Sequence, residues 1–156
     1  MRREHFTLNV TNIDWVETDD TPEKPSVSID FTGPATMLRK RLTGPDDHVL
    51  EASETDAALR LQGPIGDATT GVVSVTNRIT GEFILELNED ADDVLQFIRA
   101  ARGYGESTGD DDGRYEVEIT LDDEPFVTYD KRTFLVYDDE GSLLRQHSLI
   151  PSGVEL

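Results

Sequence analysis

The chain changes its hydrophobic period at Asn88, and this change constrains the fold more than any other feature. Before Asn88, apolar and polar residues mostly alternate, which is typical of β-strands. After it, apolar residues recur at the spacing of a helix face, at Val94, Leu95, Ile98 and Ala101, with Phe97 at the margin. Asn88 or Asp90 can cap the start of this helix, and Gly103 can end it. The pattern predicts one principal helix over about residues 90–102.

The rest of the chain has mainly β patterns. The clearest strands are predicted at residues 27–31 and 115–121, where apolar and polar side chains alternate. Residues 72–79 and 82–87 flank Thr80-Gly81 and predict a hairpin. Residues 35–42 fit either a short helix or an edge strand. Weaker strand patterns lie at residues 6–15, with a β-bulge near Thr11 or Asn12, and at residues 49–52, 57–61, 126–129, 133–137 and 143–149.

These elements predict an α+β fold that is mainly β. We expect an antiparallel sandwich or open barrel of about eight to ten strands, with the principal helix packed on it. No stretch of the sequence suggests a domain boundary, and 156 residues suffice for one buried core. The prediction is therefore a single β-rich domain over residues 1–156.

The charge of the chain is strongly negative. Its 33 acidic and 14 basic residues give a formal net charge of -19, and the acidic residues are spread through the loops. Wholesale disorder is disfavoured by a hydrophobic content of 36 % in β-periodic runs, and a nucleic-acid mimic is a weaker alternative. In molar salt the Debye length falls to about 3 Å, which screens repulsion between surface carboxylates. We therefore expect adaptation to high salt, with hydrated K or Na ions at the surface.

The same features carry a resemblance. The Asp-rich loops, the preference for arginine over lysine and the phrases MRREHFTLNV and WVETDD resemble short conserved proteins of halophilic archaea that have no assigned function. The resemblance implies a host and a salt regime. It implies no catalytic residues.

Composition also limits the compartment. The chain has no cysteine, which excludes disulfides and thiolate chemistry and fits a reducing interior. No apolar run approaches the roughly 18 residues that span a bilayer, and the N-terminus lacks the apolar core of a signal peptide. We expect a cytoplasmic protein without membrane contact.

One motif matches the nucleophile elbow of serine hydrolases. Residues 105–109 read G-E-S-T-G, and Asp122 or Asp130 and then His147 follow Ser107 in the order nucleophile, acid, base. However, the motif follows a helix and leads into three aspartates, which would oppose a developing oxyanion. A Gly- and Asp-rich loop over residues 103–113 is the favoured interpretation. We expect no catalytic residues, and the sequence favours a non-enzymatic protein over an enzyme.

Metal-binding patterns are equally incomplete. Residues 88–93 place oxygen ligands at alternate positions, but a calcium loop also needs glycine at its sixth position and glutamate at its twelfth. His5, His48 and His147 are far apart in sequence, whereas zinc needs three or four converging ligands. We expect no metal site and no cofactor.

The basic residues concentrate in one short segment. Residues 1–78 carry 13 acids and 8 bases, against 20 acids and 6 bases in residues 79–156. The densest basic stretch is Met37-Leu38-Arg39-Lys40-Arg41. It fits an intramolecular partner for the acidic loops, a docking site for a protein partner, or a weak anion or nucleic-acid site, and the last is the least favoured because salt weakens it.

Function therefore remains open between classes. The leading hypothesis is a non-enzymatic cytosolic interaction or assembly module, with exposed apolar residues such as Met37 and Leu38 beside the basic triad, and with self-association among its expectations. The first alternative is a small-molecule-binding barrel with a pocket lined by Trp15, Phe97 and Tyr115. A further alternative is weak anion or nucleic-acid binding by the triad.

Overall fold

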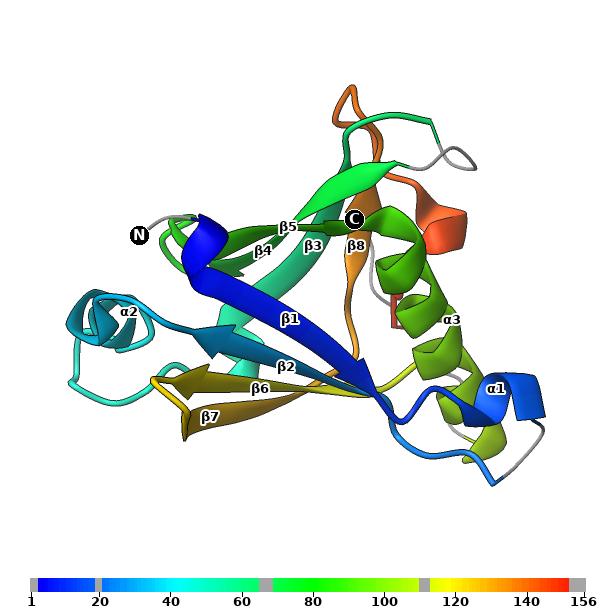
Figure 1. The fold of residues 1–156 in the computed structure, drawn as a ribbon, viewed down its shortest axis with the longest axis horizontal. Helices are drawn as coiled ribbons and strands as arrows, with labels where there is room; N and C mark the ends of the chain where they lie inside the picture. Colours follow the sequence, from blue (N-terminus) through cyan, green and yellow to red (C-terminus); the bar gives the residue numbers. More distant parts are fainter. Residues whose placement is uncertain (1–2, 19–20, 65–68, 110–112, 152–156) are drawn as a thin grey trace.

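Two four-stranded sheets and one long helix make up the fold. The computed structural model describes residues 3–18, 21–64, 69–109 and 113–151 (Figure 1). Within these residues there are eight strands, and the helix packs where the two sheets spread apart. The predicted fold class, mainly β with one principal helix, is confirmed.

The first sheet has the strand order β1-β2-β6-β7. Its strands are β1 (Phe6–Thr11), β2 (Ser26–Phe31), β6 (Tyr115–Leu121) and β7 (Glu124–Lys131). The outer pairs are antiparallel, while the central strands β2 and β6 run parallel. Alternate apolar residues of β2 and β6 are buried, as their period predicts.

The second sheet has the strand order β5-β4-β3-β8. Its strands are β3 (Thr55–Leu61), β4 (Thr70–Asn77), β5 (Phe83–Asp90) and β8 (Leu135–Tyr137). The predicted hairpin is present as β4 and β5, but β3 and β8 pair in parallel. Each sheet is thus mixed rather than wholly antiparallel. Parallel pairing needs a long crossover, which the local pattern of a strand does not reveal.

The helical segments lie at the ends of the strands. The segment of residues 35–42 is a helix rather than an edge strand, and it follows Pro34, which suits a helix start. The full set is η1 (Arg3–His5), α1 (Trp15–Thr18), α2 (Ala35–Arg41), η2 (Ala52–Glu54), α3 (Ala91–Ser107) and η3 (Arg145–His147).

Three of the predicted strands are wrong in whole or in part. Strand β1 ends at Thr11, because Asn12 takes a φ of 64° and the chain turns into α1 instead of forming a bulge. Residues 49–52 and 143–149 contribute isolated bridges and 3-10 turns, not strands. A short apolar run occurs in loops that pack on a core as well as in strands, so it does not identify a strand by itself.

The predicted end of the long helix is also wrong. Helix α3 continues through Gly103 and Gly105 to Ser107, with Thr108 as its C-cap. At Gly103 an added Cβ would lie 3.4 Å from the ring of Trp15. Gly103 therefore leaves space for the indole ring of Trp15, and it does not end the helix in a left-handed conformation. The residues predicted as the first part of a loop are the last turns of the helix.

The interior is closely packed. Phe97 of α3 meets Tyr115 with ring centroids 5.3 Å apart, and both rings adjoin Phe134. The void beneath the helix holds only about 20 Å³, which is room for about one water molecule. The sheets and α3 thus form a filled wedge.

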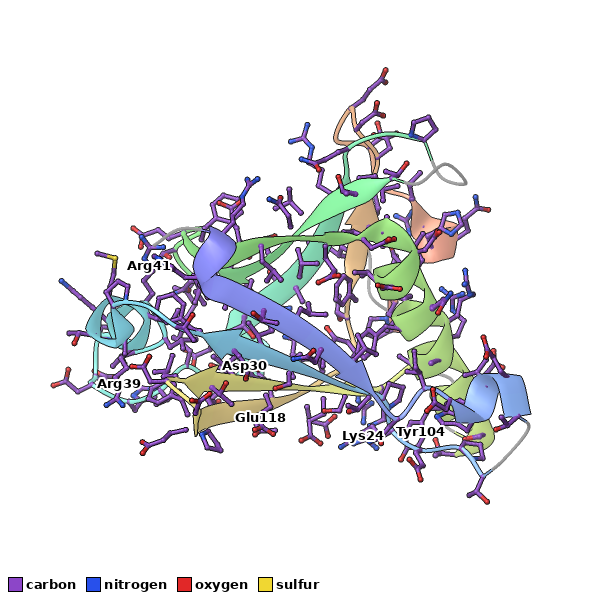
Figure 2. The ribbon with its side chains drawn as sticks, viewed as in Figure 1. Lys24, Asp30, Arg39, Arg41, Tyr104 and Glu118 are labelled. Carbon is purple, nitrogen blue, oxygen red and sulfur yellow. The ribbon has the colours of Figure 1, made fainter. Side chains whose placement is uncertain are left out.

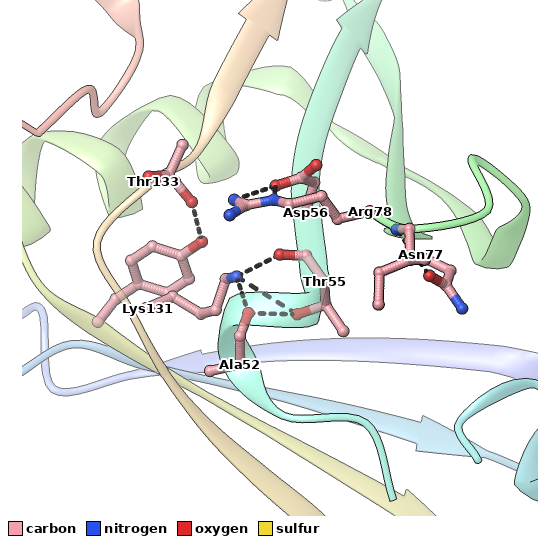
Figure 3. A network of polar contacts seen from close by, with 9 residues as sticks. Ala52, Thr55, Asp56, Asn77, Arg78, Lys131 and Thr133 are labelled. Carbon is pink, nitrogen blue, oxygen red and sulfur yellow. Dashed lines mark hydrogen bonds and ion pairs between the residues drawn. The ribbon is translucent and has the colours of Figure 1, made fainter. Parts of the chain in front are cut away.

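Polar contacts close one of the two seams between the sheets, the seam between β7 and β3. Lys131 is only 7 % exposed, and its Nζ donates to the carbonyls of Ala52 at 2.7 Å and Thr55 at 2.5 Å (Figure 3). Beside it, the Tyr115 hydroxyl donates to the Thr133 carbonyl at 2.5 Å. Burial lowers the pKa of Lys131 to about 8, against the opposing attraction of Asp56. These contacts join β7 to the segment that leads into β3.

Candidate protein-binding groove

The opposite seam, between β1 and β5, is open along part of its length. At one end η1 bridges it, where Arg3 donates to Asn88 and pairs with Glu86 at 3.4 Å. Towards α3 the two strands diverge (Figure 1). There Leu8 and Val10, which face inward from β1, are only half-buried. The apolar face of β1 is therefore incompletely covered.

The free edge of β1 presents unpaired backbone groups to this seam. Within the described residues β1 pairs with β2 alone. The Thr32 N–H donates to the His5 carbonyl at 2.9 Å, so with the antiparallel register the odd-numbered residues of β1 bond β2. The N–H and C=O groups of Phe6, Leu8 and Val10 consequently point away from β2. This is the backbone arrangement that accepts an added strand.

A groove runs beside this edge, between β1 and α3. It consists of two adjoining hollows of about 260 and 320 Å³ that share Ile13 and Gln96. Its β1 side has apolar side chains, and its other side has polar side chains from β5 and α3. The remaining lining residues are Leu8, Asn9, Val10, Asp14, Val16, Glu17, Glu89, Asp93 and Arg99.

The charge of the groove is negative. Four carboxylates line it, from Asp14, Glu17, Glu89 and Asp93, against the one guanidinium of Arg99. A cationic side chain that entered the groove would therefore be attracted.

Helix α1 forms the far end of the groove. The indole Nε1 of Trp15 donates to the Asn12 carbonyl at 2.6 Å, and its ring lies against Gly103 of α3. These contacts hold α1 on α3 and leave Val16 47 % exposed beside the groove. Val16 thus adds one exposed apolar side chain to the lining of the groove.

The predicted basic segment lies elsewhere, on α2 (Figure 2). Met37 is 45 % exposed and Lys40 is exposed, but Leu38 is fully buried, so its predicted exposure is wrong. Leu38 lies on the helix face that the core covers, which the sequence of so short a helix does not specify.

The two arginines of that segment already have partners in the fold. The Arg39 guanidinium lies 5.6 Å from the centre of the Phe126 ring, and Arg41 donates to the Ile84 carbonyl at 3.5 Å. These are intramolecular contacts, although not with the acidic loops. They do not gather the triad into one anion-binding cradle.

The predicted aromatic pocket is not formed. Phe97 and Tyr115 contact each other in the core, and burial raises the pKa of Tyr115 well above its usual range. Trp15 instead lies on the outer end of α3, and none of the hollows found in the described residues is lined by all three rings.

Ser107 is in the last turn of α3 rather than on a strained strand-to-helix turn. Its hydroxyl donates to the Tyr104 carbonyl at 2.7 Å. His147 belongs to η3, and Asp130 pairs with Arg114 at 2.8 Å. The setting that a serine nucleophile requires is absent there. The aspartates that follow, residues 110–112, lie outside the described residues.

The acidic stretch before α3 is a helix cap. Asp90 accepts from the Asp92 N–H at 2.9 Å, as predicted for the start of the helix. Across the described ranges, no group of three or more His, Cys, Asp or Glu side chains is placed to hold a metal ion.

Comparison with known protein families gives a match over the whole chain. A family model described as a family of unknown function, DUF5793, matches residues 1–156. The chain belongs to DUF5793. The expected membership of a family without an assigned function is thus confirmed. No curated protein and no solved structure matches this DUF5793 chain.

Two further findings concern this DUF5793 chain. No helix in the described part of the chain is long and apolar enough to cross a membrane.

The groove beside β1 was not predicted from the sequence. Its signal in the sequence is the phase break between Val10 and Ile13, which leaves Ile13 facing the seam when the strand ends instead of bulging.

Proposed function

We propose that this DUF5793 protein is a non-enzymatic interaction module that binds an extended segment of a partner protein as an added strand on β1. The observation that carries the proposal is the unpaired edge of Phe6, Leu8 and Val10 beside a groove bounded by α3. Main-chain hydrogen bonds to such an edge give affinity, and the alternate side chains give specificity.

The chemistry of the groove defines the partner segment. Side chains on one face of an added strand would cover Leu8, Val10 and Ile13, so they are apolar. The side chains of the added strand that would lie near Glu89 and Asp93 are lysine or arginine. The segment thus alternates apolar and basic residues and carries no proline in the phase that bonds β1.

A peptide of this pattern tests the proposal. A fluorescent nine-residue peptide of alternating valine and lysine is titrated with the protein in about 0.15 M KCl, where the Debye length is about 8 Å. We expect saturable binding by anisotropy. N-methylation of the alternate residues in one phase weakens binding at least about tenfold, because it removes several backbone donors worth about 1 kcal/mol each. N-methylation in the other phase has little effect.

Two neighbouring aspartates supply a matched pair of variants. Asp93 lines the groove, whereas Asp92 is exposed in the same first turn of α3 and does not line it. Asp93→Arg turns an attraction of about 1 kcal/mol at about 4 Å in water into a repulsion of similar size, and after screening in 0.15 M KCl this weakens binding roughly five- to tenfold. Asp92→Arg changes it little. Absence of binding at millimolar peptide, or equal effects of both variants or both methylation phases, would refute strand addition.

We propose further that the module works in the cytoplasm of a halophilic archaeal cell. The net charge of -19, the absence of cysteine and the resemblance to proteins of such organisms support this. In molar salt the charged part of partner binding is screened, and the backbone and apolar contacts of the groove supply the affinity.

A further inference from the structure

A second surface lies on the outer face of the β5-β4-β3-β8 sheet. A hollow of about 410 Å³ covers the middle of this face. Its floor is made of the small outward side chains of adjacent strands, where Ala58 pairs with Ser74 in the register and Val72 and Thr76 lie on either side. No helix covers these residues in the described parts of the chain, so a sheet face with a hollow is left open.

Large apolar side chains border the same hollow. On the β5 side, Phe83 lines the hollow and is 53 % exposed, while Ile79, which is 70 % exposed, lies outside the hollow in the preceding β4–β5 turn. On the β8 side, Leu135 and Tyr137 line the hollow. The face therefore carries both a recess and side chains of a size that would fill one.

The charge of this face differs from that of the chain. It carries Arg3, Arg60 and Arg78 against the carboxylates of Asp56 and Glu86, so its charge is close to balanced. Arg78 donates to Asp56 at 2.6 Å, and both side chains of this pair are partly exposed, so their charges largely offset each other at the surface.

The outer face of the other sheet is acidic by comparison. It carries Asp30, Glu116, Glu118 and Asp130 on β2, β6 and β7, with Lys24 and Arg114 beside Asp130. Figure 2 shows Asp30 and Glu118 on this sheet. Two copies of a chain of net charge -19 repel each other at such a face, whereas the balanced face permits close approach.

We infer that the outer face of the β5-β4-β3-β8 sheet binds a second copy of this chain. In a two-fold arrangement the same patch contacts itself, so Phe83 of each copy enters the recess of the other over Ala58 and Ser74. The arginines of each copy then meet the carboxylates of the other around a dry centre. This inference concerns a surface other than the β1 groove and does not depend on strand addition.

Filling the recess tests the dimer. Ser74→Tyr places an aromatic ring in the recess from an outward position of β4, and Phe83→Glu removes the inserted group. Ser28→Tyr makes the same exchange at an outward, half-exposed position of β2 on the other sheet. Light scattering after size exclusion, in 2 M KCl and at about 100 µM chain, measures the mass; a dimer with a micromolar Kd is well populated there.

The expected result is a dimer for the wild type and for Ser28→Tyr, and a monomer for Ser74→Tyr and Phe83→Glu. Circular dichroism melts check that all four proteins fold. A wild-type monomer at this concentration, or dimers of unchanged affinity for both recess variants, would overturn the inference. Asp93→Arg retains the dimer, so loss of peptide binding and loss of the dimer are separable.

Discussion

At the scale of single residues, Lys131 shows how a buried charge can link the two sheets. Its ammonium group satisfies two backbone carbonyls of the Ala52–Thr55 segment, and the Thr55 hydroxyl lies 3.3 Å away. Burial nevertheless favours the neutral amine, so the pKa in the folded state, about 8, lies below the ordinary value of 10.5. The contact of the charged Lys131 with the Ala52 and Thr55 carbonyls therefore includes a desolvation penalty, which lowers the free energy of unfolding near neutral pH.

This penalty predicts a rise in stability with pH. Below pH 8 the lysine is charged in both folded and unfolded states, and the full penalty applies. Between pH 8 and 10 the folded state loses its proton first, so the free energy of unfolding rises by about 2 kcal/mol. Burial raises the pKa of Tyr129 to about 12, so tyrosine ionisation opposes folding only above about pH 10. Urea unfolding from pH 7 to 10 measures the change.

The matched variant is Lys131→Met, which keeps the length of the side chain but has no ammonium group. It loses the rise between pH 8 and 10. It is also less stable at pH 7 by about 1 to 3 kcal/mol, because the Ala52 and Thr55 carbonyls are left without their donor. A wild-type profile that is flat from pH 8 to 10 would contradict this account of the lysine.

At the scale of elements, the position of α1 depends on one glycine of α3. Trp15 is the only tryptophan of the chain, and its ring is seated on Gly103. An alanine Cβ at this position meets the ring at ordinary contact distance, whereas a larger side chain must displace it. The helix α1, and with it one end of the groove, is therefore held by a contact between side chain and backbone.

Gly103→Leu is expected to push Trp15 off α3. Its fluorescence shifts to the red, and the free energy of unfolding falls by about 1 to 3 kcal/mol, the usual cost of overpacking. Gly103→Ala keeps the fluorescence of the wild type and is neutral or more stable by up to about 1 kcal/mol, because alanine favours a helix interior. A red shift in the alanine variant, or none in the leucine variant, would show that the glycine is not the seat of the ring.

At the scale of the whole molecule, net charge governs stability. A chain of net charge -19 repels itself in dilute buffer, and salt screens that repulsion. We expect Tm to rise between about 0.1 and 2 M KCl. A gain of about 2 kcal/mol corresponds to roughly 4 to 8 °C for a chain of this size. Differential scanning calorimetry over this range measures it.

A variant with four exposed aspartates changed to asparagine provides the comparison: Asp46→Asn, Asp47→Asn, Asp122→Asn and Asp123→Asn. Asp47, Asp122 and Asp123 have positive φ, which asparagine also accepts, so the turns are kept. The variant is more stable than the wild type at low salt and has a weaker salt dependence. Equal salt dependence in both proteins would indicate that self-repulsion is not the cause.

Much of the fold could be predicted where one residue pattern decides one local structure. The alternation in β2 and β6 and the helical spacing of α3 identify these elements, because burial of one face follows directly from the period. The cap at Asp90 is likewise a local hydrogen bond. The mainly β class with one principal helix follows from these elements alone.

Other features depended on contacts between residues far apart in the chain. The parallel pairs β2–β6 and β3–β8 join strands separated by long crossovers, and no local period encodes them. Gly103 has the residue type of a helix end, but Trp15 of α1 packs on it, and α3 continues past this glycine. The predicted exposure of Leu38 and the predicted pocket of Trp15, Phe97 and Tyr115 differ from the structure for the same reason. Whether a side chain is buried depends on which distant segments pack against it.

The sequence by itself thus determined the element types, the buried faces and the acidic surface, because each depends on the order and composition of neighbouring residues. Only the tertiary structure decided which strand edge stays unpaired, which sheet face stays uncovered and which seam is latched by Lys131. Those outcomes depend on how the two sheets meet and on what covers them. The β1 groove lies where the wedge stays open, and the second candidate surface lies on a sheet face that no helix of the described residues covers.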